Sequence, residues 1–151
     1  MHKHLYENTP INEKIIKIKM ENNQVNIEQH KQLIENYRRK VSNEAYRSND
    51  ARERYVNFLV ESFNNRDPNS NEHVIHVTGV SYISDLKDAM TIFNNIIKQY
   101  NYKIYKYTMF PYNCKYDDPI FIITKKDEKI SIGTKLFYYF SGYYDFDDNK
   151  L

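Results

Sequence analysis

The chain contains very little glycine, cysteine or tryptophan: three glycines, one cysteine and no tryptophan in 151 residues. The glycines stand at positions 79, 133 and 142, too far apart to build the loop that cradles a phosphate. Nucleotide hydrolysis and dinucleotide binding are therefore not expected. A single cysteine excludes a disulfide framework within the chain and a cysteine-rich zinc site. This composition favours a reducing or organellar interior.

Long apolar segments are also missing. No run approaches the roughly 20 apolar residues that span a bilayer, so no membrane partner is expected. The first residues lead into no apolar stretch, and the acids Glu7 and Glu13 do not suit a transit peptide, so neither targeting signal is expected. The chain is nevertheless 40% hydrophobic, which is enough for the core of one ordinary domain.

Charge is nearly balanced overall but unevenly distributed. The net charge of +2 does not by itself require a nucleic-acid partner. Between residues 98 and 135, however, eight lysines stand against four acids, and an acidic tail follows at 145–148. Fifteen tyrosines, with many Asn, Lys and Ile residues, are typical of an AT-rich genome, such as that of an organelle, a large virus, a phage or a microbe.

The histidines form no metal-binding pattern. His2 and His4 make an HxH pair near the terminus, which we interpret as incidental. His73 and His76 are expected on opposite faces of one strand, so they cannot easily share a metal ion. Zinc catalysis needs three or four convergent ligands, and no acid–histidine motif at helical spacing supplies them. We expect no metal and no cofactor.

The remaining candidates for chemistry have simpler explanations. Cys114 stands beside Lys115, which could lower the pKa of the thiol, but no positioned base is identifiable. Asp117 and Asp118 precede Pro119, a combination typical of a turn. We therefore predict no catalytic residue, no small-molecule substrate and no enzymatic activity.

Residues 1–72 are predicted to form an N-terminal helical extension. Ile16, Ile18 and Met20 alternate as in a short strand or docking arm. Apolar residues then recur at helical spacing over 24–42 and again after Asp50, which we interpret as a capping residue. The polar segment 64–71 is the clearest linker, so we place a domain boundary between 1–72 and 73–151.

Residues 73–151 are predicted to form a β-α-β-β domain with a long hairpin and an acidic tail. Asp85 and Asp88 suit the first turn of its helix. The expected segments are a strand at 74–80, a helix at 85–100, a strand at 102–110, a turn-prone insertion at 111–119, a strand at 120–124, a charged hairpin tip at 125–129 and a last strand at 130–140. The predicted fold class is α+β, with a ferredoxin-like or split βαβ core, a long β-hairpin and the N-terminal two-helix extension.

Tyrosines and lysines interleave along the expected hairpin. Aromatic rings among cations suit single-stranded nucleic acid, because bases stack on rings and lysines follow phosphates. The alternative is that half of these tyrosines face the core and the rest reflect codon usage. The residues are Tyr102, Tyr105, Tyr107, Tyr112 and Tyr116, with Lys103, Lys106 and Lys115. A second basic surface, or else a solvated helix face, is expected from Arg38, Arg39, Lys40, Arg47, Arg52 and Arg54.

Residues 74–144 also resemble a known family in the order and spacing of their segments. Phe110-Pro111 stands at the family's Leu-Pro turn, Ile120–Thr124 at its apolar strand, and Ile132-Gly133-Thr134 at the Ile-x-Thr pattern of its later strand. The family that this segment resembles is the universal uS-ten family of small-subunit ribosomal proteins. Ser81-Tyr82 replaces the family's Asp-His, the basic tip is shorter, and no counterpart of the family's closing helix and strand is expected.

The resemblance implies a structural constituent of the small ribosomal subunit, which is not an enzyme. It implies binding to ribosomal RNA and to neighbouring ribosomal proteins through the hairpin, with salt-dependent and sequence-independent affinity. The extension at 1–72 is foreign to bacterial members of the family. Such divergence resembles organellar members, which implies a mitochondrial ribosome. The residues implied are Lys103, Lys106, Lys115, Lys125, Lys126, Lys129 and Lys135 for phosphate, and Tyr112 and Tyr116 for stacking or packing.

Two other functions remain open. Val77-Thr78-Gly79-Val80 before an amphipathic helix is similar to one repeat of the TATA-binding-protein fold, which implies DNA minor-groove binding by a free, basic sheet face. A viral or phage structural protein, in the virion or the cytoplasm, would instead make apolar protein contacts and show no salt-sensitive nucleic-acid affinity. Its interaction module would be the N-terminal helices. A nuclease or transferase comes last, because no site supports it.

Overall fold

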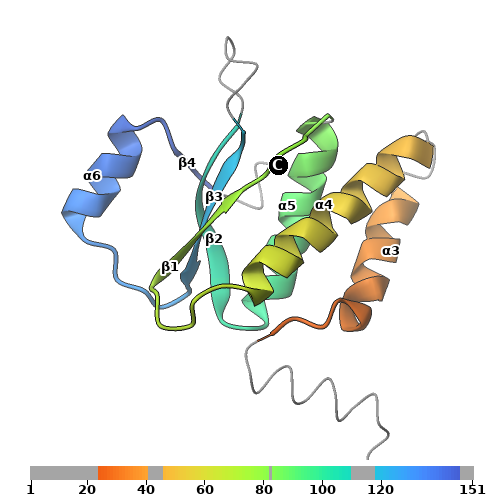
Figure 1. The fold of residues 1–151 in the computed structure, drawn as a ribbon, viewed down its shortest axis with the longest axis horizontal. Helices are drawn as coiled ribbons and strands as arrows, with labels where there is room; N and C mark the ends of the chain where they lie inside the picture. The colour runs from red at the N-terminus through yellow and green to blue at the C-terminus, as the bar shows by residue number, and fades with distance from the viewer. Residues whose placement is uncertain (1–23, 41–45, 82, 110–117, 147–151) are drawn as a thin grey trace, which may run out of the picture.

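The chain folds into a four-stranded sheet with helices on both faces (Figure 1). The structure is a computed structural model that describes residues 24–40, 46–81, 83–109 and 118–146. Its elements confirm the predicted α+β class. They are η1 (Ile27–His30), α3 (Lys31–Lys40), α4 (Tyr46–Asn64), β1 (Glu72–His76), α5 (Ile83–Lys98), β2 (Tyr102–Thr108), β3 (Ile120–Lys125), α6 (Ile132–Phe140) and β4 (Tyr144–Asp145).

The sheet is antiparallel throughout, with strand order β1-β3-β2-β4. Strand β3 lies between β1 and β2, and its register places Phe121 opposite Ile75 and Ile123 opposite Ile104. The register between β2 and β3 shifts between Ile104 and Lys106, which leaves Tyr105 in a β-bulge. The short strand β4 pairs with the outer edge of β2.

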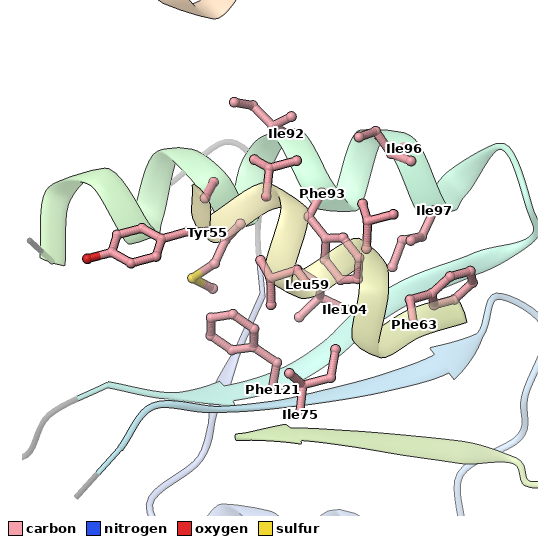
Figure 2. Packing of buried hydrophobic residues seen from close by; sticks show 14 of the residues in the cluster. Tyr55, Leu59, Phe63, Ile75, Ile92, Phe93, Ile96, Ile97, Ile104 and Phe121 are labelled. Atoms are coloured by element: carbon pink, nitrogen blue, oxygen red, sulfur yellow. The ribbon is translucent and has the colours of Figure 1, made fainter. Parts of the chain in front are cut away.

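Helices α4 and α5 lie on the same face of the sheet, and the main core fills the space beneath them (Figures 1 and 2). Phe63 of α4, Phe93 of α5 and Phe121 of β3 are fully buried in one cluster. The ring of Phe63 meets that of Phe93 edge to face, with centroids 6.2 Å apart. The division of the chain at residue 72 stays a prediction; α4, which precedes it, shares this core with α5 and the sheet.

Polar groups inside this layer have specific partners. Arg52 of α4 reaches α5, where its Nη2 lies 3.2 Å from Asp85 and its Nε 2.6 Å from Asp88. Arg52 is only 4% exposed, so its predicted place on a basic surface is wrong. Asp85, predicted to serve the helix dipole, is itself buried against this guanidinium. The buried Asn94 side chain accepts a hydrogen bond from the backbone amide of Ile104 beside the bulge.

The predicted last strand over 130–140 is wrong, because residues 132–140 form helix α6. In the segment 125–129, predicted as a hairpin tip, Lys125 ends β3 and residues 126–129 belong to the connection to α6, in which the Lys126 amide donates to the Asn101 carbonyl. A helix and a strand therefore follow β3, although no closing helix and strand were expected. The second helix also begins earlier than expected, at Tyr46 rather than near Asp50.

Several predictions fall outside the described residues. They include the short strand at 16–20, the His2–His4 pair and most of the insertion between β2 and β3, with Cys114 and the Phe110-Pro111 turn. Within the described ranges, no helix is long and apolar enough to cross a membrane.

Candidate interaction surface

Helix α6 starts at a well-formed cap. The side chain of Ser131 accepts a hydrogen bond from the amide of Thr134 at 3.2 Å and donates one to the Thr134 hydroxyl at 2.9 Å. Such a side-chain cap satisfies amides that have no partner within the helix. The cap begins a helix in the segment 130–140, which was predicted to be a strand.

Helix α6 ends in a glycine turn. Gly142 has a φ of +81°, in the left-handed region that costs glycine little. The turn lets the amide of Tyr143 donate to the carbonyl of Tyr138 at 3.1 Å, five residues back, as in a Schellman motif. Both ends of α6 are therefore determined locally.

Tyr138 anchors α6 to the sheet and is the buried residue of this helix, at 6% exposure. Its hydroxyl donates to a carboxylate oxygen of Glu72 on β1 at 2.9 Å. Its ring meets those of Tyr105 on β2 and Tyr143 edge to face, with centroids 5.9 and 5.0 Å apart. Burial raises the pKa of Tyr138 well above its usual value, and the hydrogen bond and negative charge of Glu72 raise this pKa further.

The opposite side of α6 is apolar and faces outward. Positions 132, 136, 139 and 140 follow the i, i+4, i+7, i+8 spacing of one helix face, while Tyr138 projects from the other side. Thr134, four residues before Tyr138, is half-buried, whereas Lys135 is exposed beside the outward face. We call this outward face the α6 stripe. Its members, exposed from 50% at Leu136 to 79% at Phe140, are Ile132, Leu136, Phe137, Tyr139 and Phe140.

A cavity of about 320 Å³ lies between the N-terminal end of α6 and the ends of β1 and β3. Glu72, Thr124, Lys129 and Ser131 contribute to its walls. The Thr124 hydroxyl there is buried and has no hydrogen-bond partner among the described residues. Because of this space, Tyr138 provides the main contact between α6 and the sheet.

Strand β4 is tied to β2 by an ion pair. Lys106 Nζ contacts a carboxylate oxygen of Asp145, and it lies 5.3 Å from the centroid of the Tyr105 ring. Lys106 was predicted to neutralise phosphate; in the structure its charge is offset by this aspartate. Next to it, Tyr107 packs against Tyr144 and Phe146.

The other predicted lysines lie mainly at one end of the sheet. Lys103 stands opposite Thr124 in the β2–β3 register, so it lies beside Lys125 and Lys126. Lys129 follows in the turn that lines the cavity, whereas Lys135 lies on α6. Acids share this end, because Glu72 is also paired with Thr124 and the turn contains Asp127 and Glu128. The local charge is therefore mixed.

The predicted tyrosines divide between two roles. Tyr102 is buried against Arg66 and Phe63 in the main core, and Tyr105 contacts Tyr138 on the other face. Both side chains are used in packing, which agrees with the interpretation that part of the tyrosine pattern belongs to the core. Tyr112, Lys115 and Tyr116 lie outside the described residues.

The strand histidines are separated as predicted. His73 contacts the Ser62 hydroxyl of α4 at 3.1 Å, and burial lowers its pKa, with a smaller contribution from the charge of Arg66. His76 is exposed. Across the described ranges, no group of three His, Cys, Asp or Glu side chains is placed to hold a metal ion.

Comparison with known proteins gives no assignment: no family model, curated protein or solved structure matches this chain. Any functional argument therefore depends on the residues and geometry of the chain itself.

Proposed function

We propose that this protein is a structural protein that assembles with other proteins, and that the α6 stripe is its contact surface. The observation that carries this proposal is the orientation of α6, which buries Tyr138 against the sheet and leaves its other large apolar residues exposed. An amphipathic helix that packs on its own domain normally turns its apolar side towards the core and its polar side towards water. Assembly was one of the functions suggested by the sequence, with the N-terminal helices as its module; α6 replaces them.

The size of the stripe supports this function. An aromatic side chain has about 150–250 Å² of surface, so the five partly exposed side chains present on the order of 700 Å². The largest apolar patch of a typical monomer is about 300–600 Å², and larger ones mark interaction sites. Covering these side chains would remove apolar surface from water, which favours association.

The test compares two double variants with matched chemistry. Ile132→Ser with Phe140→Ser removes the two most exposed residues of the stripe, and Ile83→Ser with Phe58→Ser makes the same changes on α5 and α4. We expect the tagged wild-type chain to sediment from a low-salt lysate of its source as an RNase-resistant assembly. The stripe variant should shift to the position of the free protein, and the control should not. An unshifted stripe variant would exclude α6 as the contact.

A second candidate is a constituent of a small ribosomal subunit, and the lysines at one end of the sheet favour it. Lys103, Lys125 and Lys126 all lie at this end of the sheet, on two strands and a turn. The arrangement of β3 between β1 and β2, with α5 as the crossover, supports a split βαβ core of the kind that the resemblance implied. For this candidate we propose RNA and ribosomal proteins as partners, and an organellar ribosome as the location.

The two candidates differ in their response to salt and RNase. Replacing Lys125, Lys126 and Lys129 by Glu should weaken RNA binding and reduce the slope of log affinity against log salt by roughly 0.7 for each lost contact with a single strand. Sedimentation of the wild-type protein in a particle that RNase disperses would agree with this candidate. An unchanged affinity and slope would reject these lysines as the RNA contact.

A further inference from the structure

We propose that the partner of the α6 stripe is a second copy of this chain, bound about a two-fold axis with α6 packed against α6. This inference rests on the proposed assembly function and names its partner. In such a symmetric dimer each copy contributes the same surface, so the surface must be complementary to itself. The α6 stripe meets this requirement in area and in charge.

The area matches that of a stable dimer. If the stripe were covered in both copies, the total buried surface would approach roughly 1,400 Å², within the range of about 1,200–2,000 Å² for standard interfaces. Its residues are three aromatic and two aliphatic side chains. Aromatic residues are enriched in interface cores and pack in edge-to-face pairs. The exposed rings of Tyr139 and Phe140, with centroids 5.3 Å apart, already show this geometry within one copy.

The charge of the stripe favours self-association over other occupants. The stripe contains no ionisable acid or base other than the Tyr139 phenol, so two copies meet without like-charge repulsion. A helix that lies on an anionic membrane is typically rich in Lys and Arg on its polar face, whereas α6 has Lys135 as its single cation. The stripe also lacks the charged groups that select an oppositely charged partner.

The symmetry makes a prediction about individual positions. Leu136 stands midway along the stripe between Ile132 and Phe140. A two-fold axis that pairs α6 with itself passes near the middle of the contact, so Leu136 should approach Leu136 of the other copy. Ile132 and Phe140, one helical turn to either side, should then pack around this centre.

The first experiment is sedimentation equilibrium of the purified full-length chain over a range of concentrations. We expect the average mass to rise from one copy towards two as concentration increases. Ile132→Ser with Phe140→Ser should abolish this rise, whereas the matched control, Ile83→Ser with Phe58→Ser, should retain it. Circular dichroism and urea unfolding of each variant separate loss of association from loss of folding.

The second experiment tests the symmetry. Leu136→Cys in a Cys114→Ser background should form an intermolecular disulfide under mild oxidation, while Phe58→Cys in the same background should form no intermolecular disulfide. Cross-linking at Leu136→Cys that is lost when Ile132 and Phe140 are also changed to Ser would support the α6–α6 contact. Equal cross-linking at both positions would reject a specific two-fold interface.

The outcomes separate this inference from the function on which it rests. A folded wild-type chain that stays monomeric at all concentrations overturns the second-copy proposal. In that case, if the stripe variant is lost from the assembly in lysate and the control variant is not, the assembly function stands with a different protein partner. If the stripe variant stays in the assembly, the second-copy inference and the proposed function both fail. Flotation of the wild-type chain, but not the stripe variant, with phosphatidylcholine–phosphatidylserine vesicles would overturn the second copy in favour of a lipid surface.

Discussion

The two faces of the sheet differ in how much apolar surface their helices bury. On one face, α4 and α5 bury Leu59, Phe63, Phe93 and other apolar residues completely, in a close-packed layer (Figure 2). Helix α6 lies on the other face (Figure 1). It is held mainly through Tyr138, and its other large apolar residues are exposed. The first face accounts for the stability of the fold. The second buries little apolar surface and leaves the α6 stripe exposed.

Phe93→Ala should cause the largest loss of stability. The side chain is fully buried and contacts Phe63, so its removal leaves a cavity that costs about 3–5 kcal/mol in the free energy of unfolding. Phe140→Ala removes the same atoms from α6 and should change this free energy by less than about 0.5 kcal/mol. Urea unfolding measures both. Equal losses would show that the α6 face is as important to stability as the core.

Arg52→Met should be almost as damaging. The change leaves the buried Asp85 without the guanidinium beside it, and breaking a buried ion pair costs about 3–5 kcal/mol. Arg54→Met, two residues further along and on the exposed side of α4, should be nearly neutral. Thermal and urea unfolding of the two variants test the contrast. A stable Arg52→Met protein would mean that the pair contributes nothing net to the core.

Tyr138→Phe should have a smaller and more local effect. It removes the hydrogen bond to Glu72 but keeps the ring contacts, so α6 should lose about 1 kcal/mol of its attachment to the sheet. Hydrogen exchange of the α6 amides should quicken roughly fivefold, with little change in α5. Tyr143→Phe, which also retains its ring, serves as the control. Unchanged exchange in α6 would show that the hydroxyl does not hold the helix.

The two faces should also respond to pH in opposite directions. Burial lowers the pKa of His30, which lies 3.5 Å from the Tyr100 hydroxyl, and also that of His73. Because the unfolded chain binds these protons more readily, their contribution is complete above about pH 6.5 and is lost as the pH falls. Tyr138 has a raised pKa, so its contribution is complete below about pH 10 and is lost as the pH rises.

Unfolding between pH 7 and pH 5 measures the first effect, and exchange of α6 amides between pH 9 and pH 11, corrected for intrinsic rates, measures the second. His30→Phe should lessen the acid sensitivity, and Tyr138→Phe should remove the alkaline sensitivity of α6. Acid sensitivity identical in wild type and His30→Phe would assign it to other groups.

Elements with a clear period were predictable from sequence. The helix predicted over 85–100 is α5, which spans Ile83–Lys98, and the strands predicted near 74–80, 102–110 and 120–124 are β1, β2 and β3. Long apolar periodicity identifies such elements because one face must be buried. The bulge at Tyr105 was not predictable, because it depends on the register with β3.

The candidate site was the part that pattern reading missed. Residues 130–140 contain an alternation that suits a strand, but also apolar residues at helical spacing, a Ser131–Thr134 cap and Gly142 as a stop. These end signals could have favoured the helix. The outward direction of the stripe had no sequence signal, since an amphipathic helix is normally expected to bury its apolar side. The lysine pattern likewise did not reveal that Asp145 would pair with Lys106.

By itself, the sequence determined the α+β class, the long helix of 83–98 and the three main strands, because local periodicity and turn residues specify these elements. Tertiary structure alone decided that Arg52 would be buried against Asp85, that β4 would pair with β2, and that α6 would attach through Tyr138. These outcomes depend on contacts between residues far apart in the chain, whose free energies no local pattern contains. The exposed stripe is one such outcome: α4 and α5 fill the main core, and α6 reaches the other face through a single buried side chain.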